Sequence, residues 1–290
     1  CVVWDIQRMG PSTGLPTRTS QGDLLKVYYL GHGDTKHVVL LPGNMEECFE
    51  FGWRSFDLAE RLQTPVFVLS DLDLGMNYWM SDPFTYPDKP MDRGKVLSKE
   101  DLDALQAEGK TFQRYADDGV TGVGPRTLPG TDHPRAAYFV RGSGHNADAL
   151  YTERPDEWQA NLVRLHHKHE YARTIVPAPV VDETAGAEIG IISFGSNETP
   201  IAEARHMLDG AGVRTSYIRL RALPVSDTVK AFIARYPQVY VIENNFDGQM
   251  HNILMTETPE HAAKLTSLRQ CDGLPLTARW IAQSIIEKER

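Results

Sequence analysis

The chain has few cysteines, no long apolar run and no excess of positive charge, and each absence excludes a class of protein. Its only cysteines, Cys1, Cys48 and Cys271, lie far apart in 290 residues and form no C-x-x-C pair. They provide neither a disulfide framework nor a complete ligand set for structural zinc or an iron–sulfur cluster. Any redox centre is therefore expected on a partner. This cysteine usage fits the reducing cytoplasm, where we expect the protein.

No apolar run approaches the roughly 18 residues that suggest a membrane span. The first residues, CVVWDI, are too short and too acidic for a signal peptide. A formal net charge of −9 argues against a broad nucleic-acid surface, which needs concentrated Lys and Arg. With 41% apolar and 24% charged residues, the composition is that of a folded globular protein. We expect a soluble chain that binds neither membranes nor nucleic acids.

Strand and helix signals alternate in the first third of the chain. The β-branched run CVVWDI reads as a buried strand that stops at a glycine-rich loop, and Val38–Pro42 and Val66–Ser70 read as two more buried strands. A helix is expected from Asp23 to about Leu30, and a long amphipathic helix follows an Asn44 cap. Strands separated by crossover helices predict a parallel sheet with helices on its faces.

The same alternation returns from Glu188 onward, with strands IGIISFG, VRTSYIRL and VYVIEN and helices over Thr199–Asp209, Asp227–Arg235 and Thr277–Glu287. The stretch between is rich in Pro, Gly and Asp, with helices expected only after a Ser98 cap and near Asp156–Arg173. Its aromatic blocks MNYWM and AAYFVRGSGHN favour a segment that wraps over another surface. We therefore predict an α/β chain in three parts, residues 1–75, 76–186 and 187–290.

The loop Gln7–Thr17, QRMGPSTGLPT, is the strongest candidate for a site. Its glycines let the backbone approach a ligand, and its prolines stiffen it. Parallel strands of α/β folds carry ligand-binding loops at their carboxyl ends. Arg8 offers a planar fork for a carboxylate, and Thr17 offers a hydroxyl. The alternative is a tight structural turn in which Arg8 pairs with a carboxylate of the protein, and the residues alone leave both interpretations open.

The exact order of residues in this loop is more informative than its composition. QRMGPSTGLPTRTSQGDL resembles the signature of the alpha subunits of 2-oxoacid:ferredoxin oxidoreductases, above all of the 2-oxoglutarate type. Further segments resemble that family in the same order along the whole chain: GHGD, ECFEFGWRSFDLAERLQTPVFVLSD, GPRTLPGT, YFVRGSGHN, FGSN, VYVIENNFDGQ and CDGLPLTA.

The resemblance implies part of a thiamine-diphosphate pyrimidine-type domain in residues 1–75 and a transketolase C-terminal-like domain in residues 187–290. It implies oxidation of a 2-oxo acid with coenzyme A to acyl-CoA and CO₂, with reduction of ferredoxin. The diphosphate, Mg²⁺ and a [4Fe–4S] cluster would be held mainly by a separate beta subunit, so this chain alone would be inactive. The positions of Arg8 and Thr17 are those that hold the 2-oxo acid in the family.

Two departures from the family bear on these expectations. Met9 stands where the family usually has glycine, so the size of the substrate, and which 2-oxo acid it is, stays open. Family members also carry, upstream of the loop, a glutamate that activates the cofactor, a tyrosine-proline-isoleucine-threonine-proline motif and a TSGPG motif, none of which occurs in residues 1–290. We expect a fragment whose catalytic residues lie elsewhere. The alternative is a non-catalytic scaffold of the same fold.

The remaining candidates are weaker. Ser12 and Thr13 in the loop, His145 in RGSGHN and Asn245 are candidates for active-site or interface contacts, with an ordinary loop histidine as the alternative for His145. Glu243, Asn244, Asn245 and Gln249 form a polar cluster of the kind that lines a cleft or an interface, and we favour an interface. A helix cap by Ser196 or Asn197 explains FGSN as well as a phosphate site does. The HHKH run at 166–169 is assigned to a solvated basic helix face, and Asp117–Asp118 to solvated loop charges.

Overall fold

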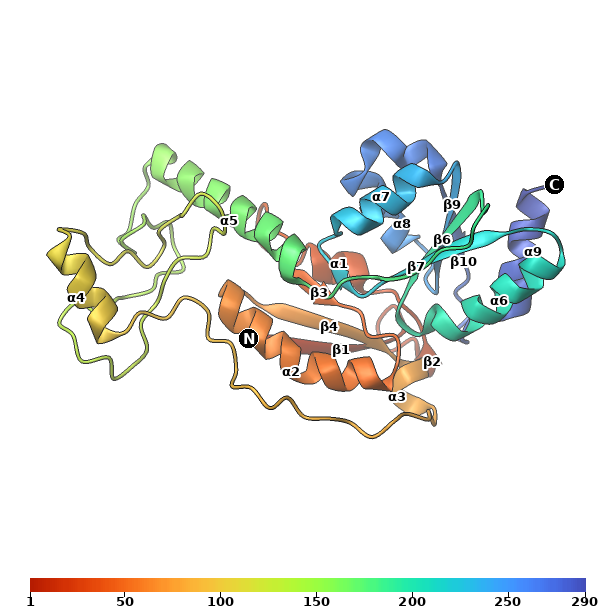
Figure 1. Cartoon of the computed structure of the whole chain (residues 1–290), viewed down its shortest axis with the longest axis horizontal. Coiled ribbons are helices and arrows are strands. Elements are labelled where there is room, and N and C mark those ends of the chain that lie inside the picture. Colours follow the sequence, from red (N-terminus) through yellow and green to blue (C-terminus); the bar gives the residue numbers. More distant parts are fainter. The chain divides into compact units, whose positions relative to one another are not determined.

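The computed structural model describes all 290 residues and divides them into two compact units. The first unit contains residues 1–55, 65–87 and 176–290, and the second contains residues 56–64 and 88–175. Two five-stranded sheets with flanking helices make up the first unit (Figure 1). The predicted α/β class is therefore confirmed.

The first sheet has the strand order β2-β1-β4-β3-β8. Its three central strands are parallel: β1 (Val2–Met9), β4 (Val66–Asp71) and β3 (Val38–Leu40). The edge strands β2 (Leu15–Thr19) and β8 (Ala222–Leu223) run antiparallel to their neighbours, so the all-parallel prediction is wrong at both edges. Strand β8 comes from the second half of the chain.

Strand β1 is less buried than its apolar sequence suggested. Val3, Trp4 and Ile6 are 42%, 38% and 43% exposed, and Gln7 is the buried residue of the strand. β2 pairs with β1 at Arg8 and Met9, so the remainder of that edge has no strand beside it. Within this chain, the strand predicted to be buried is therefore only partly covered.

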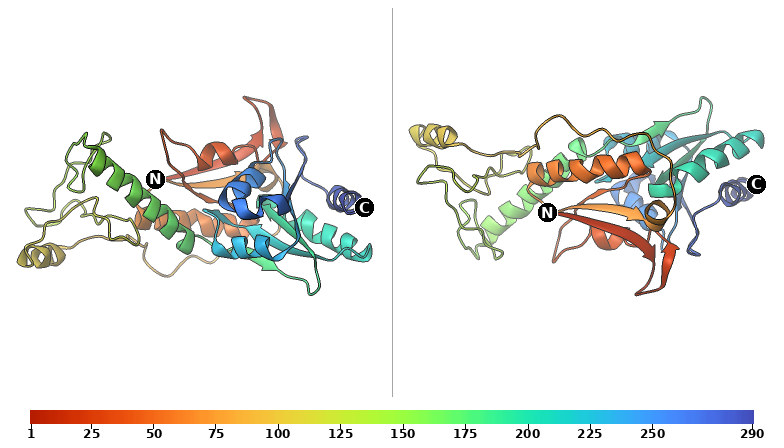
Figure 2. Two further views of the ribbon diagram at one scale, coloured as in Figure 1. Left: turned by 90° about the horizontal axis from the view of Figure 1, so that it is seen from above. Right: turned by 90° about the horizontal axis from the view of Figure 1, so that it is seen from below.

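Helices cover both faces of the first sheet. Figures 1 and 2 show α1 (Leu24–Tyr28) on one face and α2 (Met45–Leu62) on the other, while α3 (Leu72–Met76) follows β4 directly. The Asn44 side chain accepts from the backbone N–H of Glu47 at 2.9 Å, which confirms the predicted cap of α2.

The second sheet has the order β10-β9-β6-β7-β5. Four strands are parallel: β10 (Leu265–Arg269), β9 (Gln238–Glu243), β6 (Ile189–Phe194) and β7 (Thr215–Leu220), while β5 (Val180–Asp182) is antiparallel at the edge. Helices α6 (Glu198–Gly210) and α9 (Ala278–Lys288) pack on one face. Helices α7 (Asp227–Arg235) and α8 (Gln249–Glu257) pack on the other. Strand β10 and helix α8 were not predicted from the sequence.

One apolar core joins the two sheets. It contains Val27 and Tyr28 of α1, Phe67 of β4, Ile218 of β7 and Met250 of α8, with many further buried side chains. A buried ion pair adds to this connection, because Glu47 in the first turn of α2 binds Arg219 of β7 through two hydrogen bonds of 2.7 and 2.8 Å. The first unit is therefore one folded body built from both ends of the sequence.

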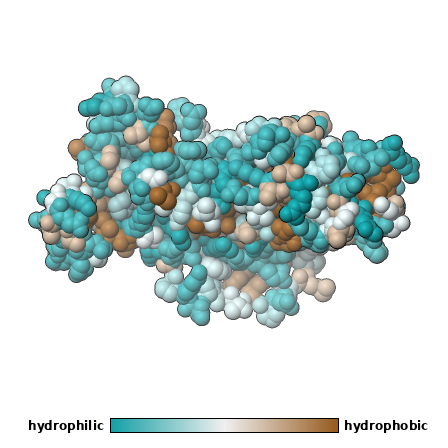
Figure 3. All heavy atoms as spheres, turned by 45° about the horizontal axis from the view of Figure 1, so that its top comes forward, coloured by the Kyte–Doolittle hydropathy of each residue, from teal (hydrophilic) through white to brown (hydrophobic).

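The second unit has little regular structure. It contains α4 (Lys99–Ala107), α5 (Pro155–Ile175) and the end of α2. Ser98 caps α4 as predicted and forms a capping box with Asp101. The surface in Figure 3 is largely hydrophilic, with apolar side chains in small separate areas. None of the helices has the length and apolar character needed to cross a bilayer.

Candidate active site

The loop predicted between a strand and a helix is a β-hairpin in the structure. β1 continues through Arg8 to Met9, the chain turns over Gly10–Gly14, and β2 leads back antiparallel. Gly14 has φ +50°, and a Cβ there would lie 2.0 Å from the carbonyl oxygen of Met9. The glycine therefore permits a close approach of the two hairpin arms, which the sequence pattern attributed to ligand binding alone.

Two buried glutamines, which the sequence did not single out, fix the hairpin to the body of the unit. Gln7 donates to the carbonyl of Ser70 at 3.2 Å and accepts from the backbone N–H of Asp23 at 3.0 Å. Gln21, two residues after β2, donates to the carbonyl of Phe194 at 3.1 Å. These bonds hold the hairpin's base against the carboxyl ends of strands from both sheets.

The FGSN segment contributes to the same network and does not cap a helix. Ser196 donates to the Asp71 carboxylate at 2.7 Å, and Asn197 donates to the side-chain oxygen of Gln21 at 2.9 Å. No side chain caps α6, so the predicted cap is wrong. Burial raises the pKa of Asp71, although its hydrogen bonds from Ser196, Leu74 and Gln21 act in the opposite direction.

The polar cluster that follows β9 is directed inward. The Glu243 carboxylate is fully enclosed and accepts from Asn245 and from the backbone N–H groups of Met250 and His251. Gln249 accepts from Leu25 N–H at 2.8 Å. The predicted interface is therefore wrong for Glu243, which organises the start of α8.

A pocket of about 1080 Å³ lies along β1 and the hairpin. Its walls come from β1, the hairpin tip, the segment leading into α1, and the turn after β9. It is lined by Val3, Trp4, Asp5, Ile6, Arg8, Met9, Gly10, Pro11, Ser12, Ser20, Gly22, Asp23, Lys26, Val27, Leu30, Phe67, Asn245, Phe246, Asp247, Gln249 and Cys271. This volume is sufficient for a small organic acid and more.

Arg8 is the cation best placed to bind a ligand there. Arg8 is exposed and lines the pocket, and its side chain forms no hydrogen bond or ion pair within the chain. The alternative in which Arg8 pairs with a carboxylate of this chain therefore does not apply. Asp5 also lines the pocket, and its pKa is raised by burial and by Asp23, while Lys26 acts in the opposite direction.

The candidate residues from the sequence separate into three groups. Arg8, Ser12 and Asn245 line the pocket together. Thr13 and Thr17 lie in the hairpin, exposed, but do not line it. His145 belongs to the second unit, where its ring stacks on Tyr115 with centroids 3.8 Å apart.

Met9 has a defined position in the same wall. Its thioether sulfur lies 3.4 Å from the Cys271 thiol, and both side chains line the pocket. The side chain that departs from the family's glycine is therefore packed against the segment after β10.

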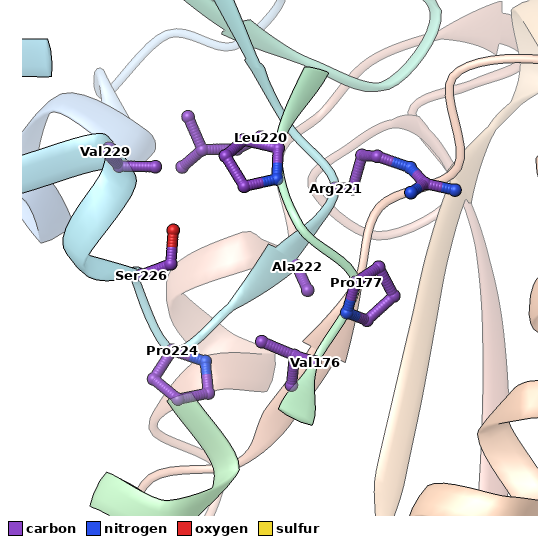
Figure 4. A pocket seen from close by; sticks show the side chains of 9 residues that line it. Val176, Pro177, Leu220, Arg221, Ala222, Pro224, Ser226 and Val229 are labelled. Carbon is purple, nitrogen blue, oxygen red and sulfur yellow. The ribbon is translucent and has the colours of Figure 1, made fainter. Parts of the chain in front are cut away.

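Figure 4 shows a second hollow, lined by Val176, Pro177, Pro179, Leu220, Arg221, Ala222, Pro224, Ser226 and Val229. This hollow has no room for a water molecule. It is therefore a small gap in the packing next to the segment that leads into β5, and it cannot hold a ligand.

The charged segments of the second unit differ from the prediction. Lys168 in HHKH donates to the carbonyl of Gln63 at 3.2 Å, and burial together with Arg164 and Arg114 lowers its pKa to about 7. Asp118 binds Lys95 at 2.6 Å, and despite its partial burial such bonds lower the pKa of its carboxyl. The prediction of a solvated basic face is therefore wrong for Lys168, whereas Asp117 and Asp118 are exposed loop charges as predicted.

Comparison with known proteins shows which proteins this chain is similar to. Residues 1–102 match the family described as pyruvate flavodoxin/ferredoxin oxidoreductase, thiamine diphosphate-binding. The chain is 30% identical to subunit alpha of the 2-oxoacid:ferredoxin oxidoreductase 2 of Aeropyrum pernix, over 96% of this chain and 42% of that one. It is 31% identical to the 2-oxoglutarate synthase subunit KorA of Methanothermobacter thermautotrophicus, over 86% of this chain and 63% of that one. Over most of its length, this chain is similar to the alpha subunits of 2-oxoacid:ferredoxin oxidoreductases.

A solved structure supports the relationship over the whole chain. The 2-oxoglutarate:ferredoxin oxidoreductase from Magnetococcus marinus, solved with 2-oxoglutarate, coenzyme A and succinyl-CoA bound, superposes with a TM-score of 0.83 at 28% identity. The match covers 100% of this chain and 49% of that one. The chain thus spans about two fifths to two thirds of the length of these relatives.

Proposed function

We propose that this chain contributes the carboxylate-binding hairpin of a 2-oxoacid:ferredoxin oxidoreductase. The complex would convert a 2-oxo acid and coenzyme A to acyl-CoA and CO₂ and pass electrons to ferredoxin. The single observation that carries the proposal is Arg8, an exposed and unpaired guanidinium on the wall of the pocket. The alpha-subunit relatives, including a homologue solved with 2-oxoglutarate, support this substrate class.

In this proposal the chain's own residues bind and orient the substrate. The fork of Arg8 holds the carboxylate through charge-assisted hydrogen bonds. Ser12 adds a hydroxyl from the hairpin tip, whereas Thr17, which is exposed on β2 and does not line the pocket, is assigned no contact with the substrate. Gln7 and Gln21 keep the hairpin in place, because their side-chain amides bind the sheet ends beneath it.

The cofactor is assigned to a partner. The chain has no group of three His, Cys, Asp or Glu side chains arranged to hold a metal ion. We propose that a beta subunit holds thiamine diphosphate, Mg²⁺ and the [4Fe–4S] cluster, and that the site is completed in the complex. No step of the reaction through these groups is assigned to this chain.

Replacing Arg8 should weaken substrate binding strongly. In the alpha subunit purified with its beta partner, Arg8→Ala is expected to raise the KM for 2-oxoglutarate roughly 10- to 100-fold, because a hydrogen-bonded charge contributes about 1.5–3 kcal/mol. Arg8→Lys should recover part of this loss, since it restores the charge without the planar fork. The assay is coenzyme-A-dependent reduction of viologen at varied 2-oxo acid.

Arg18→Ala is the matched control, because Arg18 is an exposed arginine of the same hairpin that does not line the pocket. Its KM should equal that of the wild type. An unchanged KM in Arg8→Ala would contradict the role of Arg8. An assembled wild-type complex without any viologen reduction would favour the non-catalytic scaffold.

A further inference from the structure

Three basic side chains contact one aromatic ring in the second unit, and a fourth lies one helical turn away from one of them. The ring is that of Tyr115, on which His145 stacks with an interplanar angle of 21°. The guanidinium carbons of Arg114 and Arg164 lie 5.1 and 5.3 Å from the ring centroid. Lys168 lies one helical turn after Arg164 on α5, on the same face of the helix. We refer to Arg114, His145, Arg164 and Lys168 as the basic cluster.

None of the cations in the basic cluster forms an ion pair. Their hydrogen bonds go to neutral oxygens: Arg114 to Gln63 Oε1 (3.1 Å) and Gly124 O (3.5 Å), Arg164 to Asn161 Oδ1 (3.3 Å) and Gly122 O (3.2 Å), and Lys168 to Gln63 O (3.2 Å). Asp117 is the carboxylate whose charge acts on Arg164, and it is already bound by His167 at 2.9 Å. The Nε of Arg114 is buried and has no hydrogen-bond partner.

This arrangement concentrates positive charge away from water. Arg164 is 6% exposed, and cations at positions i and i+4 of one helix face repel each other. Lys168 and His145 reduce the repulsion by binding protons less tightly, because burial and the two arginines lower the pKa of each. The arginines do not deprotonate, so two charges remain uncompensated at any ordinary pH.

We propose that the basic cluster is a binding site for a small oxoanion, of which inorganic phosphate and sulfate are the simplest members. A guanidinium group carries several N–H donors in a planar fork, which suits the oxygens of a tetrahedral oxoanion, and Arg114 and Arg164 both lie beside the Tyr115 ring. The unpartnered Nε of Arg114 is a donor that such an anion satisfies. The anion compensates the charge of the two arginines, and its negative charge favours the protonated forms of Lys168 and His145, which then donate further hydrogen bonds to it. This site is separate from the proposed 2-oxo acid site and does not depend on it.

The test is titration calorimetry of the alpha subunit, in complex with its partner, with sodium phosphate and with sodium sulfate at constant ionic strength. Sodium chloride and sodium acetate serve as comparison salts. Lys168→Met and Arg164→Met are each expected to weaken phosphate binding at least tenfold. Arg154→Met is the matched control, because Arg154 is an exposed arginine of the same unit whose partner is Asp156, and it should bind as the wild type does.

Sulfate keeps its charge between pH 6 and pH 8, so it isolates the protonation of the protein. Its affinity should rise as pH falls through about 7, where Lys168 gains a proton, and this dependence should disappear in Lys168→Met. Equal affinities for chloride and phosphate, binding of acetate but of neither tetrahedral anion, or equal losses in Arg154→Met and Lys168→Met would overturn the proposal. Circular dichroism of each variant verifies that it is folded.

Discussion

Lys168→Met is expected to raise the free energy of unfolding at pH 7 by about 2 kcal/mol in buffer without oxyanions. Burial with Arg164 and Arg114 lowers the pKa of Lys168 to about 7, from an ordinary value of 10.5. A tenfold change in proton affinity between the folded and unfolded chain corresponds to ~1.4 kcal/mol. Partial water contact of the side chain and the lost bond to Gln63, about 1 kcal/mol, reduce the gain. Methionine fills the same volume without a charge.

The pH dependence of this gain has a definite sign. Because the folded-state pKa of Lys168 lies below the unfolded one, protonation favours the unfolded chain. The advantage of Lys168→Met should be absent above pH 10.5, grow as pH falls towards 7, and level off below 7. Urea denaturation followed by circular dichroism measures it, with Lys110→Met as control, because the Lys110 side chain is 66% exposed. A gain that does not change with pH would contradict the explanation.

Glu47→Gln should have the largest destabilising effect in the first unit, a loss of about 3–5 kcal/mol in the free energy of unfolding. Glu47 is buried and binds both Arg219, whose side chain is 2% exposed, and Arg221. Removing its charge leaves Arg219 buried with the half-exposed Glu198 as its remaining carboxylate. Glu46→Gln is the matched control, because Glu46 is the neighbour in the same helical turn and binds neither arginine, and it should change little.

Lowering the pH should reduce the difference in the free energy of unfolding between Glu47→Gln and the wild type. Burial raises the pKa of Glu47, but hydrogen bonds and charges of Arg219 and Arg221 outweigh it and hold the pKa below its ordinary value of 4.5. The stabilisation is therefore complete above about pH 4.5 and lost as pH falls through the lowered pKa. Denaturation midpoints between pH 3 and pH 7 test this. Equal denaturation midpoints of Glu47→Gln and the wild type at pH 7 would contradict a stabilising role of the Glu47–Arg219 ion pair.

Local signals predicted most of the regular structure. The Asn44 and Ser98 caps and the apolar runs at Val66–Ser70 and Asp227–Arg235 have correct positions, since each depends on residues close in sequence. Long-range pairing was not predictable in the same way. Strand β2 forms because Arg8 pairs with Thr19, and α8 depends on the enclosed carboxylate of Glu243.

The candidate site was predicted in part. The sequence of the loop identified Arg8 and Ser12, and both residues line the pocket. Gln7 and Gln21 could not be identified, because a lone glutamine in a sequence is uninformative until its partners, the carbonyls of Ser70 and Phe194, are known. The prediction for Lys168 is wrong for a related reason: its neighbours His167 and His169 suggested solvent, while Arg114 and Gln63, distant in sequence, enclose it.

The two-residue strand β8 has a consequence for the order of folding. It completes the edge of the first sheet by pairing with β3, although it lies far downstream in the chain. Contacts between residues so distant in sequence carry a high loop-closure cost and form late. During synthesis, the hairpin that carries Arg8 would leave the ribosome long before the sheet beneath it gains its last strand. The hairpin that carries Arg8 gains still later support, because Thr19 N–H donates to the carbonyl of Gly273, so its contacts are complete only after Gly273 has been made.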